Sequence, residues 1–164
     1  MRKTGGLALG TRKGNAMEGQ VSIEITGGRG EIVGRSEGQC YYKNGHHYVL
    51  FSEELSEDGK KGGVTFSSRL KISGDEVVLR RSLPDDKGGA RHVMEFTYRK
   101  RGEEEHGCMV DYPTPYGTMR LEIRTQELEI AHGEEEILAQ IRYQMMQDSQ
   151  EVSQDDLRIV IRKA

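Results

Sequence analysis

The segment 34–38, GRSEG, contains a serine whose neighbours match the pattern of a hydrolase nucleophile. In such enzymes a sharp strand-to-helix turn exposes the serine beside a later Asp and His. Here the following residues, QCYY at 39–42, have the character of a strand, and no alternation of strands and helices comes after them. We therefore interpret the match as chance and predict no catalytic residue.

Histidines and glutamates are the residues that could bind a metal ion. His46-His47 are adjacent, and neighbours on a strand point to opposite faces, so they cannot easily share one metal. We interpret them as part of a solvated turn. The runs 103–105 and 134–136 are all glutamate and could attract cations, but their spacing is not that of a calcium loop. We predict solvated turns there, and neither a metal nor a cofactor.

Glu53 and Arg81 are charged residues at positions expected to face an interior. Glu53 shares a strand face with Phe51, and Arg81 shares another with Leu79, because alternate residues of a strand point to one side. If both faces point inward, the two charges must pair, since a lone buried charge costs several kcal/mol. Such a pair can be a structural latch, which is the commoner role, or an anchor for a ligand head group.

Aromatic and hydroxyl side chains could complete a site around that pair. Tyr112, Thr114 and Tyr116 are separated by prolines that stiffen the chain, and we expect them at the same end. An enzyme acting through Glu53, Arg81 and Tyr116 is the less favoured interpretation, because no nucleophile, metal set or poised histidine accompanies them. The candidate ligand-binding residues are Phe51, Glu53, Arg81, Phe96, Tyr112, Thr114, Tyr116 and Tyr143.

Polar and apolar residues alternate along most of the chain, which is typical of strands with one face in a core and one in water. Clear examples are VSIEI at 21–25 and MRLEI at 119–123. The alternation favours an antiparallel sheet, because parallel strands buried on both faces are continuously apolar. We predict strands at 18–26, 36–43, 47–55, 63–72, 76–82, 91–99, 106–112, 117–125, 127–132, 136–147 and 155–163, two or three of which could be one bent strand.

Turn residues separate these segments. Asn44-Gly45 predicts a type I′ hairpin turn, since both central residues of that turn need a positive φ. Loops are expected at 56–60, 73–75 and 84–89, which are rich in Gly, Asp and Ser. The segment 147–155 is a short, weak helix candidate.

The chain has 164 residues, of which 34% are hydrophobic and 31% are charged, a low apolar content for one domain. Many antiparallel strands must close or stack, because a flat sheet would expose its edges. A barrel needs only one apolar lining, so this composition can build it. We predict an all-β, antiparallel up-and-down β-barrel of about eight to ten strands, with a β-sandwich as the alternative.

Three segments resemble one protein family. YPTPYG at 112–117, YVLFSEE at 48–54 and VVLRR at 77–81 are similar to segments of the YwiB-like family, small bacterial proteins of uncharacterised function. The resemblance runs from about Met17 to the C-terminus and departs after Arg81, where SLP stands in place of a glycine. It implies a calycin-type (lipocalin-like) barrel and no particular activity.

The net charge of −3 is an average over two unlike parts. Residues 1–16 carry four basic side chains and no acid, so 17–164 carry −7 once that +4 is removed. We expect 1–16 to be a flexible basic tail and 17–164 to be one barrel domain. The acidic domain argues against nucleic acid as a partner, and no apolar run approaches the length of a membrane span. Two cysteines without a CxxC pair and the lack of a signal-peptide pattern predict a cytoplasmic protein.

Two functions fit these features. The first is a binding module whose barrel holds a small apolar or amphipathic molecule. The second is a regulatory module that is not catalytic, whose barrel is filled by its own side chains and whose loops bind a protein partner. A small barrel permits both, because its interior is just wide enough either to be filled by side chains or to hold one ligand.

Overall fold

The computed structural model describes residues 16–27, 32–55, 64–83, 92–99, 107–114 and 116–164, and every regular element in these ranges is a strand. No helix in this part of the chain is long and apolar enough to cross a membrane. The strands are β1 Gly19–Gly27, β2 Ile32–Lys43, β3 His46–Leu55, β4 Val64–Ile72, β5 Glu76–Leu83, β6 His92–Arg99, β7 Cys108–Thr114, β8 Gly117–His132, β9 Glu136–Gln147 and β10 Gln150–Lys163.

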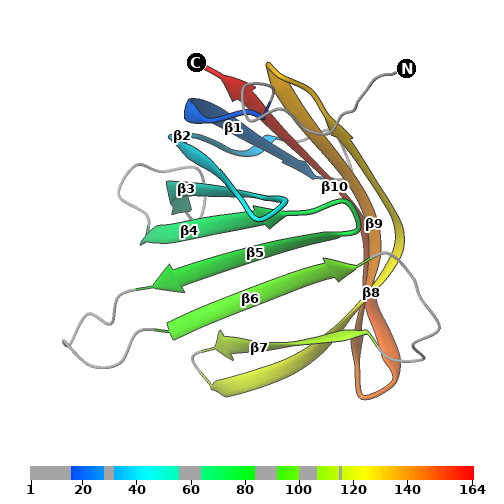
Figure 1. Cartoon of the computed structure of the whole chain (residues 1–164). Helices are drawn as coiled ribbons and strands as arrows, with labels where there is room; N and C mark the ends of the chain where they lie inside the picture. The colour runs from blue at the N-terminus through cyan, green and yellow to red at the C-terminus, as the bar shows by residue number, and fades with distance from the viewer. Residues whose placement is uncertain (1–15, 28–31, 56–63, 84–91, 100–106, 115) are drawn as a thin grey trace.

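The ten strands form one antiparallel sheet that curls into a nearly closed barrel (Figure 1). Strands β1 to β6 pair in sequence order, and so do β7 to β10. The first and last strands, β1 and β10, also pair with each other. β6 and β7 are the edges of the sheet, and no ladder joins them among the described residues. The predicted all-β, up-and-down barrel is therefore confirmed.

Two predicted strands prove to be one, and the predicted helix is wrong. The strands expected at 117–125 and 127–132 form the single β8, in which a bulge at Gln126 shifts the register against β9. The segment 147–155 is a tight hairpin that leads into β10. Asp148 and Ser149 have φ values of 50° and 66°, which is the geometry of a two-residue hairpin turn. Pairing of β9 with β10 thus overrides the weak local helix signal.

The connection between β2 and β3 is the turn expected from the sequence. Asn44 and Gly45 have φ values of 53° and 80°, as a type I′ turn requires. This turn fixes the register of the hairpin, in which Cys40 lies opposite Val49 and Gly38 opposite Phe51. The inward faces of β2 and β3 follow from that register.

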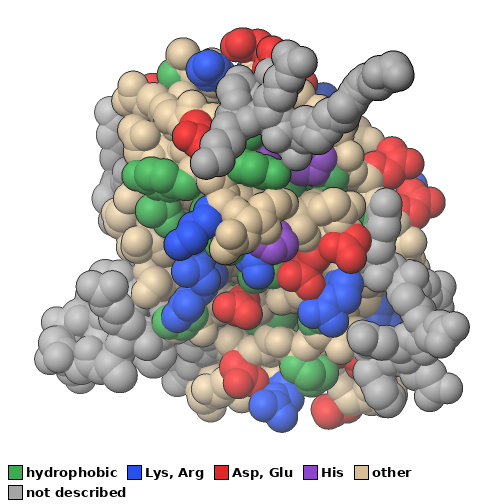
Figure 2. All heavy atoms as spheres, in the orientation of Figure 1, with side chains coloured by type: hydrophobic (Ala, Val, Ile, Leu, Met, Phe, Trp, Pro, Cys, Tyr) green, Lys and Arg blue, Asp and Glu red, His purple; other side chains and the backbone are tan. Residues whose placement is uncertain are grey.

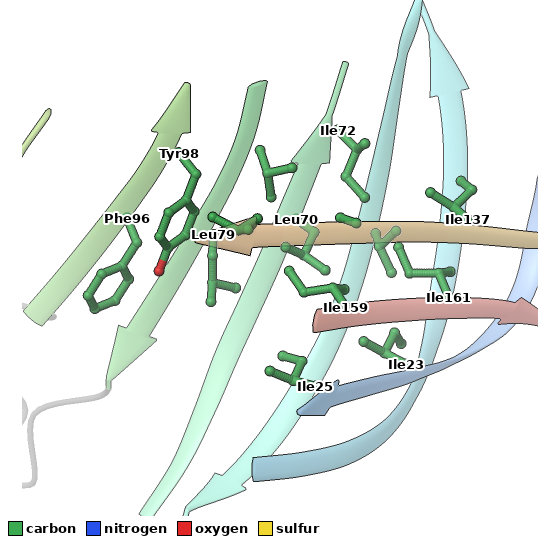
Figure 3. Close-up of a cluster of buried hydrophobic side chains, with 14 of the residues drawn as sticks. Ile23, Ile25, Leu70, Ile72, Leu79, Phe96, Tyr98, Ile137, Ile159 and Ile161 are labelled. Carbon is green, nitrogen blue, oxygen red and sulfur yellow. The ribbon is translucent and has the colours of Figure 1, made fainter. Parts of the chain in front are cut away.

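The core is formed by alternate residues that point into the barrel (Figure 3). Ile23 and Ile25 of β1 are each 2% exposed, and Ile159 of β10 is fully buried. Leu70 and Ile72 reach the same cluster from β4, on the wall opposite β1 and β10. One apolar lining therefore serves all walls, as the low apolar content requires.

Candidate functional site

Glu53 and Arg81 meet because of the register of three neighbouring strands. Ser68 of β4 lies opposite both Phe51 of β3 and Arg81 of β5, and Glu53 follows Phe51 by two residues on the same inner face. The Arg81 Nε donates to Glu53 Oε2 at 2.7 Å, and Nη2 donates to Oε1 at 3.1 Å. The Ser68 hydroxyl donates to Oε2 at 2.8 Å. The pairing expected from the alternation is confirmed.

The ion pair is largely withdrawn from water but not sealed. The Glu53 side chain is 5% exposed and that of Arg81 is 16% exposed. Arg81 carries five N–H donors, and two of them go to Glu53, so three have no acceptor in the described part of the chain. The Arg81 Cζ also lies 5.8 Å from the centroid of the Phe96 ring, within reach of a cation–π contact.

The two ends of the barrel interior differ in exposure. At the closed end, near the β4–β5 turn, the inward side chains of Ile72, Val77 and Ile137 are 0% exposed. At the opposite end, inward positions of four strands are only half-buried. We call this the open end, and its half-buried residues are Gly34, Ser36, Arg81, Met119, Tyr143 and Met145.

Two tyrosines add hydroxyl groups to the interior. The rings of Tyr98 and Tyr143 lie 5.2 Å apart at 61°, and the two side chains share a hydrogen bond. Burial raises the pKa of both hydroxyls, and the positive charge of Arg81 only partly opposes this. Both tyrosines therefore stay protonated at neutral pH and keep a hydroxyl hydrogen to donate.

Five of the eight predicted site residues line the interior. Around the ion pair, Phe51 and Phe96 are each 6% exposed and supply apolar walls. Tyr143 lies at the same open end, half-buried. The predicted residues that line the interior are Phe51, Glu53, Arg81, Phe96 and Tyr143.

The remaining three predicted residues differ from one another in position. Tyr116 is 99% exposed, so its side chain does not belong to the interior. Tyr112 is on the inner face of β7, opposite Met119, but it is 39% exposed there. Tyr112 lies on the edge strand β7, and Tyr116 lies in a turn next to Gly117, whose φ is 122°. The side chain of Thr114 lies outside the described atoms. The proline spacing predicted a stiff turn but not the exposure of Tyr116.

Residues 18–159 match the family model "Domain of unknown function (DUF1934)". The chain belongs to this family. It is also similar in fold to the crystal structure of the ywiB protein from Bacillus subtilis, with a TM-score of 0.64 and 16% sequence identity over 92% of this chain and 96% of that chain. At this identity the similarity shows the fold alone, in agreement with the YwiB-like resemblance. No curated protein matches significantly.

The DUF1934 barrel also contains a histidine pair that the sequence did not indicate. His47 is 6% exposed, so its expected place in a solvated turn is wrong. Its ring lies 5.6 Å from that of His132 at 26°, and neither of its nitrogens has a hydrogen-bond partner in the described part of the chain. Burial lowers the pKa of both histidines. The alternation along β3 places His47 at its first inward position, opposite Ile72. The contact of His47 with His132 joins residues far apart in the sequence, and no local pattern indicates it.

Other candidate residues of the DUF1934 barrel have structural positions. Ser36 lies within β2 opposite Ile23, so the GRSEG segment forms no strand-to-helix turn. Both cysteines are free, and burial raises the pKa of the Cys40 thiol to about 11. Glu134 and Glu135 are exposed, as predicted for a solvated turn.

Some predictions fall on residues without a described placement, or are answered only in part. The glutamates at 103–105 and the tail at 1–15 lie outside the described residues. Within the described ranges, no group of three or more His, Cys, Asp and Glu is arranged to hold a metal ion. The interior at the open end is therefore the best candidate site.

Proposed function

We propose that the barrel is a binding module that takes a small, partly apolar molecule through its open end and holds a polar group of that molecule at Arg81. The observation that carries this is the set of donors that the ion pair does not use: the Arg81 side chain is 16% exposed and keeps three N–H donors beyond the two used on Glu53.

The surroundings define the chemistry of the ligand. Phe51, Phe66 and Phe96 are 6–8% exposed and offer an apolar surface to the body of a ligand. Glu53 orients the guanidinium and offsets its charge, so a carbonyl or carboxylate oxygen is a fitting acceptor. On β2 the inward positions near the open end are the small residues Gly34 and Ser36, which leave space beside the aromatic rings.

The energetics of buried ion pairs support a role beyond stability. Well-packed apolar residues in place of a buried pair are often neutral or stabilising, because the charges must be taken out of water. An ion pair set among Phe51, Phe96 and Met94 therefore adds little to the stability that apolar side chains would give. The two free thiols fit a reducing compartment, and we propose the cytoplasm as the location.

The test combines native mass spectrometry with a titration. A small molecule retained by the purified protein, or saturable binding of decanoate by calorimetry, is the expected result. Ser36→Phe should abolish binding because the ring fills the open end, whereas the matched control Ser22→Phe, on the exposed face of β1, should bind like the native protein. Arg81→Gln should weaken decanoate binding about ten-fold, the loss expected for a charge-assisted hydrogen bond. Circular dichroism checks that each variant is folded.

The opposite outcome favours the second function. A bare mass, no decanoate binding and no effect of Ser36→Phe would overturn the ligand proposal. A filled barrel that binds a protein partner would then fit better, since Met109, Tyr112 and Tyr116 expose 53%, 39% and 99% of their surfaces on the β7–β8 hairpin. Exposed apolar side chains grouped on one hairpin are typical of protein interaction sites.

A further inference from the structure

Arg69 and Arg80 differ from most of the described arginines on the outer surface. Arg35, Arg120 and Arg162 each have a carboxylate oxygen at 2.7–3.1 Å. Arg69 and Arg80 have no ion-pair partner among the residues that the structure describes. Their positive charges are therefore not neutralised, although the barrel domain as a whole is acidic.

The two arginines are also direct neighbours. Arg69 of β4 lies opposite Arg80 of β5, and both side chains are exposed on the outer face of the sheet. Like charges directly opposite each other on a sheet are destabilising. Glu95 of β6 faces Arg80 in the register but makes no ion pair with it. The facing Glu95 offsets this repulsion only from the β6 side, and a bound anion would offset it further.

A row of hydroxyl groups lies beside this pair. Ser67 of β4 is opposite both Ser52 of β3 and Ser82 of β5, and all three side chains are on the outer face. They line a groove of about 580 Å³ together with Arg69, Arg80, Glu37, Leu50, Phe51 and Ser68. Figure 2 shows Lys and Arg side chains gathered over the β4–β5 region of this face. We call the surface formed by Ser52, Ser67, Arg69, Arg80 and Ser82 the arginine groove.

We propose that the arginine groove binds the phosphate group of a small phosphate monoester. Two adjacent guanidinium groups present planar forks of donors that match phosphate oxygens, and the serine hydroxyls supply further donors. Leu50 lines the groove and is 45% exposed, and Val93, opposite Ser82, is 40% exposed. These apolar edges favour a monoester with an apolar or aromatic part over free phosphate. The arginines of the groove lie on the outer face and Arg81 on the inner one, because neighbouring residues such as Arg80 and Arg81 point to opposite faces of β5.

The test uses phenyl phosphate and inorganic phosphate as probes. Calorimetry at low ionic strength should show saturable binding of phenyl phosphate by the native protein. Arg69→Gln and Arg80→Gln should each weaken binding about ten-fold or more, the loss expected for charge-assisted hydrogen bonds. Arg158→Gln is the matched control, because Arg158 is an exposed arginine on β10 with no ion-pair partner in the described residues. Binding by this control should equal that of the native protein.

The melting temperature is a second readout, and its first comparison needs no ligand. In a chloride buffer without phosphate, Arg80→Gln should melt at the same temperature as the native protein or higher, because the repulsion is relieved. At the same concentration, phenyl phosphate should raise the melting temperature of the native protein more than that of Arg80→Gln. Tighter binding of phenyl phosphate than of inorganic phosphate supports the monoester, and the reverse order assigns the groove to free phosphate. No saturable binding, or equal losses in Arg80→Gln and Arg158→Gln, would overturn the proposal.

Discussion

At the scale of single residues, the sequence indicated one buried polar group, the Glu53–Arg81 pair, but not the other, His47. The pairing of Glu53 with Arg81 follows from alternation along β3 and β5 together with the rule that buried charges need partners. The burial of His47 could not be foreseen, because no local pattern shows which turns are covered by other parts of the chain. Each residue makes a separate prediction.

Removing either partner of the ion pair should destabilise the protein strongly. Glu53→Ala and Arg81→Ala are each expected to lower the free energy of unfolding by about 3–5 kcal/mol, because the other charge is left buried and unpaired. Urea unfolding measures this. Arg120→Ala breaks an exposed pair with Asp111 and should cost less than about 1 kcal/mol. Near-neutral effects at Glu53 and Arg81 would contradict the buried pair.

His47 should make stability fall on mild acidification. Burial, and then the nearby His132, lower its pKa in the folded state, while Glu18 partly opposes them. The unfolded chain therefore takes up the proton first, as pH drops through its ordinary pKa of 6.5, and unfolding is favoured. The urea midpoint of the native protein should fall between about pH 7.5 and pH 5. His47→Leu should lose part of that dependence, and an unchanged pH profile in this variant would argue against the buried neutral histidine.

At the scale of elements, the inner face of β2 packs closely against β3 at one position and borders open space at another. Its inward positions Gly34, Ser36 and Gly38 are small, whereas Cys40 at the closed end is buried in the core. Gly38 must be small because a Cβ there would collide with the carbonyl oxygen of Leu50 and come within 2.9 Å of the Phe51 Cβ. A Cβ at Gly34 would meet nothing within 4 Å. The inner face of β2 is therefore closely packed at Gly38 and open at Gly34.

Alanine at these two positions tests that difference. Gly38→Ala should lower the free energy of unfolding by about 1–3 kcal/mol, because β2 and β3 must move apart to admit the methyl group. Gly34→Ala should change it by less than about 0.5 kcal/mol, since the methyl group enters open space. Chemical unfolding of both variants gives the comparison. Equal effects would show that the approach of β2 to β3 is not as close as described.

At the scale of the whole molecule, the barrel joins the two ends of its sequence and leaves its gap in the middle. β1 pairs with β10, while β6 and β7 are the edges of the sheet. The interior is sealed at the closed end by fully buried residues such as Ile72 and Ile137. Polar groups such as Arg81 and Tyr143 lie toward the other end. This asymmetry makes the open end the place where the Ser36→Phe test applies.

The sequence by itself determined the strand content, the antiparallel pairing and the need of a buried Glu53 for a partner. Period-two alternation, the Asn44-Gly45 turn and the need of Glu53 for a partner are local or pairwise properties, and they can be read from spacing alone. The tertiary structure decided what depends on which distant strands become neighbours. Closure of β1 on β10, the meeting of His47 with His132 and the opposition of Arg69 to Arg80 all require a register across the sheet. The exposure of Tyr116 belongs to the same class, because burial depends on the packing of the whole chain and not on the residues beside it.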